Sequence, residues 1–270
     1  MRTHLFTDGS GRIAQSVRNA VEAARNPYGI PAGNDFLQRR KIYKYRLNHP
    51  GSIWFWKVML MLETLETGTT TIALICKDGV IMAADRKATA GFMIVDKKAQ
   101  KIYQIARKMA LTTSGTVSDI QLLTKLIKAE LSLKKFRTEI EPSTQEASNL
   151  LAGMVFHNIR RFSVIPGITH FILAGHDRNG FQVYDIFADG SVSKVDDYFS
   201  SGSGSVFALG VLDTLFKPDM SKKEAVELAK RAVNAALQRD AASGEGLDII
   251  LITSEGIEEV FSQKLGVSIS

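Results

Sequence analysis

The sequence predicts an α+β fold in which layers of β-sheet are covered by helices on both sides. Two observations lead to this prediction. Blocks of β-branched and apolar runs alternate with pairs of helical segments along the chain, and the hydrophobic period changes at each boundary between them. The composition, 45% hydrophobic and 23% charged over 270 residues, is that of an ordinary globular protein able to bury a sizeable core.

The first strand block follows the glycine at position 68. Its opening two strands are separated by Lys77-Asp78-Gly79, whose Asp-Gly pair is a hairpin signal. A later strand closes at Gly115. The strands predicted in this block cover residues 70–76, 80–84, 102–105 and 110–114.

Two helices should follow. Apolar residues recur at helical spacing over residues 116–137, with lysines among the polar positions. Ser143 and Glu146 form a capping-box pattern after Pro142, which predicts a second helix over residues 143–161.

The second half of the chain repeats this order. Glycine-containing turns separate short strands, Pro218 ends one helix, and Ser221 with Glu224 opens another through a second capping box. The predicted strands are 169–175, 181–187, a short one near 192, 247–253 and 256–261, and the predicted helices are 206–216 and 221–240.

The net charge of +6 does not indicate a nucleic-acid partner. Residues 1–68 carry ten Lys/Arg and five Asp/Glu, so they account for +5, and the rest of the chain is nearly neutral. No apolar run reaches the roughly 18 residues that a membrane span needs. The start of the chain also lacks the apolar core of a secretory signal.

Familiar hydrolase and metal signatures are absent from the sequence. Gly202-Ser203-Gly204 has the wrong spacing for a nucleophile elbow. The five histidines form no metal-binding pattern, so we expect no metal site. The single cysteine, Cys76, excludes an intrachain disulfide and ends an apolar run, which favours a small core residue.

The stretch from Gly68 to Thr71 is unusual. A glycine, a weak strand former, is followed by three threonines, which are good ones. Cleavage between Gly68 and Thr69 would leave Thr69 with a hydroxyl and a free α-amine on neighbouring atoms, which is a nucleophile with its own base.

Several motifs together resemble the β-subunit of the 20S proteasome, of the archaeal type, over residues 62–270. They occur in the family's order and are therefore specific. The motifs are Thr67-Gly68-Thr69-Thr70-Thr71-Ile72-Ala73, Lys77-Asp78-Gly79-Val80-Ile81-Met82-Ala83-Ala84-Asp85-Arg86, Lys101, Ser201-Gly202-Ser203-Gly204-Ser205 and Gln238-Arg239-Asp240-Ala241-Ala242-Ser243-Gly244.

The resemblance implies a four-layer αββα sandwich of the N-terminal nucleophile hydrolase type and a threonine-type endopeptidase. Thr69 matches the nucleophile, which is freed when the precursor cuts itself between Gly68 and Thr69. Lys101 matches the active-site lysine, whose cation favours the alkoxide-like form of the threonine oxygen, and Asp85 matches its acidic partner.

Other site residues are implied in the same way. Ser203, Asp240 and Ser243 match polar residues that orient the amine and a water; on their own, Ser203 would be a turn or helix N-cap and Asp240 a helix-end charge. Gly115 matches the residue whose backbone N–H forms the oxyanion hole.

Specificity is implied by small, uncharged side chains. The family positions that line the first substrate pocket are Ala88, Ala99, Thr113 and Val117, while Thr89 and Gly115 offer backbone contacts to an extended peptide. Such a pocket favours apolar residues and offers no carboxylate to a basic one, so we expect a chymotrypsin-like preference.

The resemblance divides the chain into residues 1–68, a propeptide or N-terminal extension, and residues 69–270, the catalytic domain. Family members usually carry a short propeptide, which residues 62–68 alone resemble. Residues 1–58 are therefore either an extension that assists folding or assembly, or the result of a translation start placed too far upstream of Met59 or Met61; we favour the second.

The implied partners are a homo-oligomeric heptameric β-ring, proteasome α-subunits, a regulatory ATPase and unfolded polypeptide substrates, in the cytoplasm, with no cofactor, nucleic acid or membrane. Two alternatives stay open: the bacterial two-ring relative with a different ATPase, and a non-catalytic structural ring subunit. Loss of Thr69, Asp85 or Lys101 would favour the latter, and all three are present.

Overall fold

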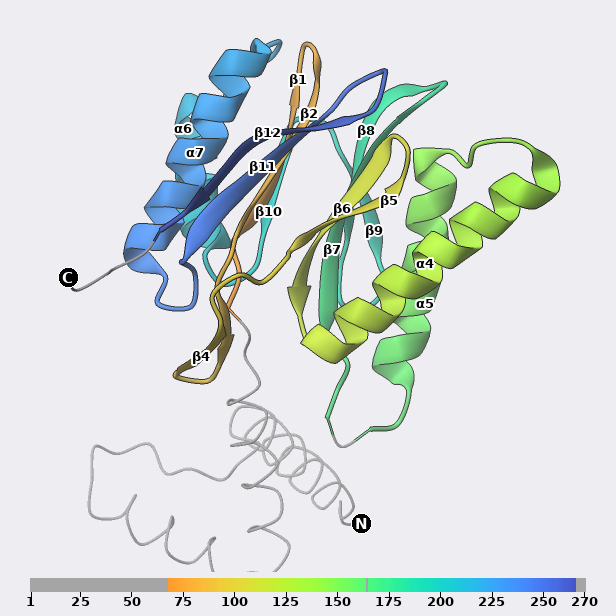
Figure 1. Ribbon diagram of the computed structural model, residues 1–270, viewed down its shortest axis with the longest axis horizontal. Helices are drawn as coiled ribbons and strands as arrows, with labels where there is room; N and C mark the ends of the chain where they lie inside the picture. The colour runs from red at the N-terminus through yellow and green to blue at the C-terminus, as the bar shows by residue number, and fades with distance from the viewer. Residues whose placement is uncertain (1–67, 164, 266–270) are drawn as a thin grey trace, which may run out of the picture. The chain divides into compact units, whose positions relative to one another are not determined.

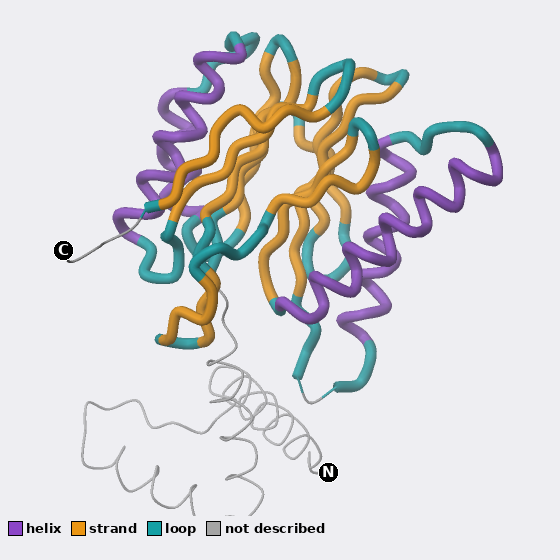
Figure 2. The backbone as a smooth tube through the Cα atoms, viewed as in Figure 1, coloured by secondary structure: helices purple, strands orange, loops and turns teal. Residues whose placement is uncertain are grey.

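The computed structural model describes residues 68–163 and 165–265, which form four layers (Figure 1). Two five-stranded sheets face each other, and a pair of helices covers the outer face of each sheet (Figures 1 and 2). The predicted α+β, four-layer architecture is confirmed.

The first sheet has the order β10-β1-β2-β11-β12 and is antiparallel throughout. The central strands β1 and β2 are almost entirely buried because helices cover one face and the second sheet covers the other. The strands are β1 Thr71–Cys76, β2 Gly79–Asp85, β10 Tyr198–Ser201, β11 Gly246–Ile252 and β12 Ile257–Lys264.

The second sheet has the order β5-β6-β7-β8-β9, also antiparallel. A separate hairpin, β3-β4, lies between β2 and β5 in the chain. These strands are β3 Ala88–Ala90, β4 Met93–Asp96, β5 Ile102–Ala106, β6 Met109–Gly115, β7 Thr169–Asp177, β8 Gly180–Ile186 and β9 Val192–Val195.

The four described helices are α4 Val117–Thr138, α5 Thr144–Arg160, α6 Ser205–Leu215 and α7 Lys222–Arg239. Both predicted capping boxes are confirmed: Ser143 with Glu146 opens α5, and Ser221 with Glu224 opens α7. Each box satisfies N–H groups that the first helical turn leaves without an intrahelical partner. None of these helices is long and apolar enough to span a bilayer.

Three apolar cores hold the layers together. Leu228 of α7 belongs to the core between the first sheet and α6 and α7, and Leu151 of α5 belongs to the core between the second sheet and α4 and α5. Between the sheets, Ala73, Met82 and Ile172 belong to a third core. The site described below lies at one end of this intersheet layer, where β1 begins and β6 ends.

The predicted helix ends agree with the structure to within a residue or so, whereas three strands were not predicted. Strand β4 is exposed at all four positions and has no apolar alternation to recognise. Strands β3 and β10 are short, and β10 exists because it pairs with β1, which lies far away in the sequence.

Candidate active site

Thr69 lies two residues before the start of β1 and is 3% exposed. The loop between β10 and α6 contacts Thr69, and the Gly204 N–H in this loop donates to the Thr69 carbonyl oxygen at 3.2 Å. Gly202 has φ +95°, and a Cβ at this residue would lie 2.1 Å from the same carbonyl oxygen. Position 202 therefore requires a glycine for two reasons, the positive φ of its backbone and the close approach of Thr69.

Lys101 and Asp85 form a buried ion pair, with Lys101 Nζ 2.7 Å from Asp85 Oδ1. Asp85 ends β2 and Lys101 comes one residue before β5, as the sequence predicted. Burial lowers the pKa of Lys101 below that of a free lysine, and Asp85 opposes the shift through its charge and its hydrogen bond. The amine is consequently easier to deprotonate than a lysine in water.

Asp85 accepts four hydrogen bonds, enough to satisfy a buried carboxylate. Its Oδ1 accepts from Lys101 and, at 2.9 Å, from the backbone N–H of Thr70. Its Oδ2 accepts from the backbone N–H groups of Lys87 and Gly244 at 3.1 and 2.9 Å. The carboxylate therefore joins the start of β1, the end of β2 and the loop after α7 to the lysine.

Ser203, Asp240 and Ser243 form the second cluster beside Thr69. Ser203 and Ser243 each donate to Asp240 Oδ2 at 2.6 Å. Ser203 Oγ also accepts from the Thr69 N–H at 3.2 Å, and Ser243 Oγ lies 2.7 Å from Thr70 Oγ1. The three residues thus lie together beside Thr69, and their role in catalysis stays a prediction. Asp240 is the C-cap residue of α7, whereas the N-cap of α6 is Gly204 rather than Ser203.

The Gly68 carbonyl oxygen is the point on which the predicted nucleophile and the predicted lysine converge. Thr69 Oγ1 donates to it at 2.7 Å and Lys101 Nζ donates to it at 3.1 Å. The Gly68 N–H in turn donates to Thr89 Oγ1 at 3.1 Å. The bond between Gly68 and Thr69 therefore lies beside the Thr69 hydroxyl, and the Lys101 amine donates a hydrogen bond to its carbonyl oxygen.

Gly115 ends β6 with φ +115°, and a Cβ there would lie 2.2 Å from the Ile168 carbonyl oxygen. Its neighbour Ser114 contacts Ser201, with the two Oγ atoms 2.9 Å apart. Because Ser201 directly precedes the loop that wraps Thr69, the end of β6 is brought to the same region.

The residues proposed to line the substrate pocket lie around the site in several settings. Thr113 is buried and its N–H donates to the Lys101 carbonyl oxygen, while Thr89 contacts Gly68 as described. Ala88 is buried on β3, and the Ala99 N–H donates to the Arg86 carbonyl oxygen. Val117, the first residue of α4, is 45% exposed. Their role as one pocket stays a prediction.

Two features of the candidate site were not predicted from the sequence. Thr70 links the clusters, since its N–H binds Asp85 and its hydroxyl contacts Ser243. Backbone N–H groups, such as that of Gly244, supply three of the four donors to Asp85, and no side chain marks them in a sequence. The sequence predicts that Thr70 begins a strand, and this pattern gives no sign of the two contacts.

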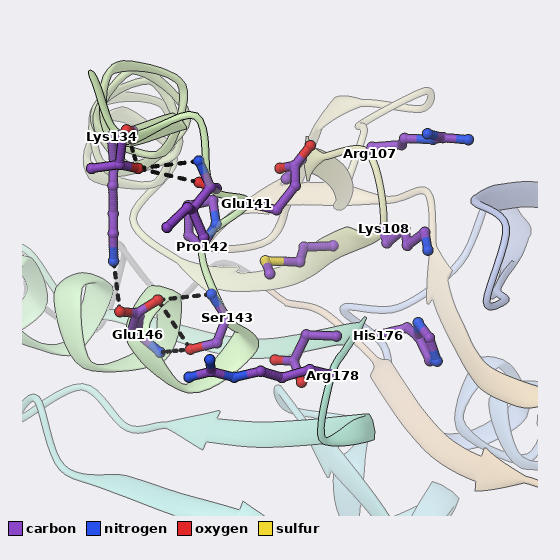
Figure 3. A pocket seen from close by; sticks show the side chains of 14 residues that line it. Arg107, Lys108, Lys134, Glu141, Pro142, Ser143, Glu146, His176 and Arg178 are labelled. Atoms are coloured by element: carbon purple, nitrogen blue, oxygen red, sulfur yellow. Dashed lines mark hydrogen bonds and ion pairs between the residues drawn. The ribbon is translucent and has the colours of Figure 1, made fainter. Parts of the chain in front are cut away.

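A cavity of about 750 Å³ in the described region lies elsewhere (Figure 3). It is lined by the β5–β6 turn, the α4–α5 connection and the β7–β8 turn, at the opposite ends of β5 and β6 from Lys101 and Gly115. Figure 3 shows the Arg107 and Lys108 side chains directed away from Glu146 and Arg178, so the cations do not converge on one point. Within the described residues, no group of three or more His, Cys, Asp or Glu side chains is arranged to hold a metal ion.

The profile of the family described as "Proteasome subunit" matches residues 65–252. "Proteasome subunit beta" of Archaeoglobus fulgidus is 40% identical over 193 residues, which cover 72% of this chain and 89% of that protein. "Proteasome subunit beta" of Methanoregula boonei is 41% identical over 199 residues, covering 74% and 92%. "Proteasome subunit beta 2" of Aeropyrum pernix is 37% identical over 199 residues, covering 74% and 88%. The chain therefore belongs to the proteasome subunit family.

Proposed function

We propose that this chain is a proteolytic β-subunit of a 20S proteasome core, a threonine protease whose nucleophile is the Thr69 hydroxyl. The observation that carries the proposal is the meeting of Thr69 Oγ1 and Lys101 Nζ at the Gly68 carbonyl oxygen. A hydroxyl nucleophile, a buried amine with a lowered pKa and a polarised carbonyl are the parts that acyl transfer requires.

The first reaction is self-cleavage between Gly68 and Thr69. Thr69 Oγ1 bonds to the Gly68 carbonyl carbon and gives up its proton, the bond from that carbon to Thr69 N breaks, and the nitrogen takes up a proton to become an amine. Water then hydrolyses the ester that remains and restores the hydroxyl. Because no free α-amine exists before cleavage, Lys101 is the candidate base for this step.

The same atoms serve peptide hydrolysis after cleavage. The new α-amine, with a reference pKa of about 8, lies where Ser203 Oγ already contacts Thr69 N and can accept the hydroxyl proton. Lys101 stabilises the developing negative charge on the threonine oxygen, and the Gly115 N–H serves as the oxyanion donor. Water then releases the acyl group from Thr69.

Residues 1–68 are, in this proposal, a propeptide or extension absent from the working enzyme, and residues 69–270 are the catalytic domain. The family's assembly into rings supports homo-oligomeric heptameric β-rings between rings of α-subunits. A regulatory ATPase would supply unfolded polypeptides in the cytoplasm. Enclosure in such a particle would restrict access to a pocket that selects weakly among apolar residues.

The test is the intact mass of the assembled protein, measured together with peptide hydrolysis. Wild type should lose everything through Gly68 and cleave peptides, whereas Thr69→Ala should keep its full length and be inactive. Thr69→Ser, which keeps the hydroxyl, should be cleaved and retain activity. Active wild-type particles that still contain the uncut chain would refute the mechanism. N-terminal sequencing of Thr69→Ala expressed from its own gene would show whether residues 1–58 are translated.

The same particles test the pocket. A substrate ending in Leu or Tyr should be cut faster than one ending in Arg, because no carboxylate is proposed to line the pocket. Faster cleavage after Arg would overturn this preference while leaving the nucleophile assignment intact. An inactive, uncleaved wild type within assembled rings would favour a structural ring subunit instead, and assembly without α-subunits would favour the two-ring relative.

A further inference from the structure

A second set of polar side chains, buried or partly buried, connects the two sheets close to Thr69, and it has no part in the chemistry described above. Ser114 Oγ on β6 lies 2.9 Å from Ser201 Oγ on β10. Ser201 Oγ lies 2.9 Å from Nδ1 of His170 on β7, and His170 Nε2 pairs with Asp185 on β8. We call Ser114, Ser201, His170 and Asp185 the intersheet network.

The network is tightly surrounded by other groups. Ser114 and Ser201 are 6% and 3% exposed, and both hydroxyls have partners within the network. The His170 ring lies edge-on to Phe187, with centroids 5.0 Å apart, and tilted against Phe199 at 6.1 Å. Where such a network is fully satisfied, it specifies one arrangement of the groups around it.

The two serines are adjacent in the chain to different parts of the proposed active site. Ser114 directly precedes Gly115, the proposed oxyanion donor on the second sheet. Ser201 directly precedes the loop of the first sheet, in which Ser203 contacts the Thr69 N–H and Gly204 donates to the Thr69 carbonyl oxygen. The hydroxyl–hydroxyl contact therefore links the strand end that carries Gly115 to the loop that holds Thr69.

We propose that His170 is a positioning residue: by holding Ser201 against Ser114 through Nδ1, it sets the spacing between Gly115 and Thr69. This inference rests on the proposed threonine protease function. His170 touches neither the Gly68 carbonyl nor Thr69 in any hydrogen bond of the described residues, so it acts through the serines and not on the substrate.

The possible hydrogen-bond directions indicate that the contact between His170 Nδ1 and Ser201 matters, and not the charge of the imidazole. Neutral His170 with its proton on Nε2 donates to Asp185 and accepts from Ser201, which then accepts from Ser114. If Nδ1 is protonated, it donates to Ser201, and the serines reverse their donor and acceptor roles. Every group keeps a partner in both states, so the contact at Nδ1 persists.

Two substitutions at His170 separate this role from general packing. Both remove the ring, but the amide of His170→Asn can stand where Nδ1 stands and contact Ser201, whereas the longer His170→Gln reaches Asp185 instead. We expect His170→Asn to keep kcat within about twofold of wild type. His170→Gln should lower kcat about tenfold with little change in KM, because the reacting groups shift while the pocket is untouched.

Ser114→Ala and Ser201→Ala provide independent variants that leave the imidazole in place. Each should lower kcat about tenfold, as His170→Gln does, and His170→Gln should cause no further loss in the Ser201→Ala background because the contact is already absent. The matched controls are His176→Asn and His176→Gln, at the other end of the same strand, which should both match wild type.

Equal kcat values for His170→Asn and His170→Gln, or additive losses with Ser201→Ala, would overturn the inference. Wild-type particles supply the separate check on the proposed function, through cleavage after Gly68 and peptide hydrolysis. If wild type fails that check, the threonine protease assignment fails. If wild type passes and His170→Gln hydrolyses peptides as fast, only the positioning role is refuted.

Discussion

Asp85 shows how a single side chain organises the candidate site. Asp85 is 1% exposed, and its carboxylate accepts from three backbone N–H groups as well as from Lys101. Burying a charge is costly unless it is paired and hydrogen-bonded, and Asp85 meets both conditions. Its loss would affect the lysine and the positions of three backbone segments together.

Asp85→Asn keeps the shape of the side chain and removes its charge. We expect kcat/KM to fall by at least about 100-fold, because Lys101 loses the charge that holds it and the amide rearranges the donors around it. The pKa of Lys101 should fall further, since the influence that opposes burial is removed. The measurement is peptide hydrolysis by the assembled, mass-verified variant, and activity within a few-fold of wild type would contradict the prediction.

Asp85→Asn should also change how the free energy of unfolding depends on pH. A lysine whose pKa is lowered on folding binds fewer protons folded than unfolded, so stability rises with pH between the lowered pKa and the ordinary value of 10.5. In Asp85→Asn this window should extend to lower pH. Denaturant unfolding in the Thr69→Ala background should therefore show a steeper rise in stability toward alkaline pH than in the parent. Adding Lys101→Met should abolish the difference, and its persistence would assign the slope to another group.

At the scale of elements, the loop between β10 and α6 depends on its glycines. Gly202→Ala would place a Cβ 2.1 Å from the Thr69 carbonyl oxygen at a positive φ, so something must move. We expect a loss of about 1–3 kcal/mol in stability, together with loss of cleavage after Gly68. Intact mass and thermal unfolding measure the two effects.

Gly210→Ala is the matched control. Gly210 lies within α6, and a Cβ there meets nothing within 4 Å. Stability should rise by about 0.5–1 kcal/mol because alanine is the better helix former, and cleavage should be unchanged. Normal processing of Gly202→Ala would show that the loop adapts without moving Thr69.

The capping box of α5 should contribute to acid sensitivity. The hydrogen bond from Lys134, followed by those from Ser143, lowers the pKa of Glu146 to about 2. The folded state therefore favours the carboxylate, and this stabilisation is present above pH 4.5 and is lost as the pH falls toward 2. Because the side chain is 54% exposed, we expect a contribution of only about 1 kcal/mol after solvent screening.

Glu146→Gln should be less stable than wild type by about this amount at pH 6, and the gap should narrow by pH 3. Urea unfolding at both pH values measures it. Lys134→Met, which removes the ion pair and leaves the capping box, should reproduce part of the effect. A gap independent of pH would mean that Glu146 acts through hydrogen bonding alone.

The sequence predicted those helices and strands that are determined by residues close together in the chain. The two capping boxes and the helical spacing of α4 placed the helices closely, because side chains a few residues apart determine these features. Strand β10 depends on pairing Ser201 with Thr71, a contact between distant segments, and its serines resemble a turn. Local pattern therefore could not identify it.

At the scale of the molecule, the candidate site joins residues from almost the whole described chain. Thr69 precedes β1, Lys101 precedes β5, Gly115 ends β6 and Asp240 caps α7. The family resemblance identified these residues because it rests on several motifs at once. It could not supply the contacts through Thr70 or the intersheet network, which become visible only when the two sheets are placed face to face.

This arrangement predicts that the intersheet core matters for activity more than the helix-covered core does. Met82→Ala and Leu228→Ala each remove a nearly or fully buried side chain, one from between the sheets and one from between the first sheet and its helices. Each should cost about 2–5 kcal/mol in stability. Only Met82→Ala should also lower kcat, because the sheets carrying Thr69 and Gly115 would settle at a different spacing.

The comparison requires a temperature well below both unfolding midpoints, so that each variant is fully folded and kcat reports the geometry of the site. Cleavage after Gly68, confirmed by mass, ensures that both variants carry a free Thr69. If Met82→Ala then matches Leu228→Ala in kcat while being equally destabilised, the sheets hold their spacing without a full core. The positioning of Thr69 against Gly115 would in that case depend on the polar contacts at the strand ends, among them those of Ser201 with Ser114 and with His170, which join the two sheets directly.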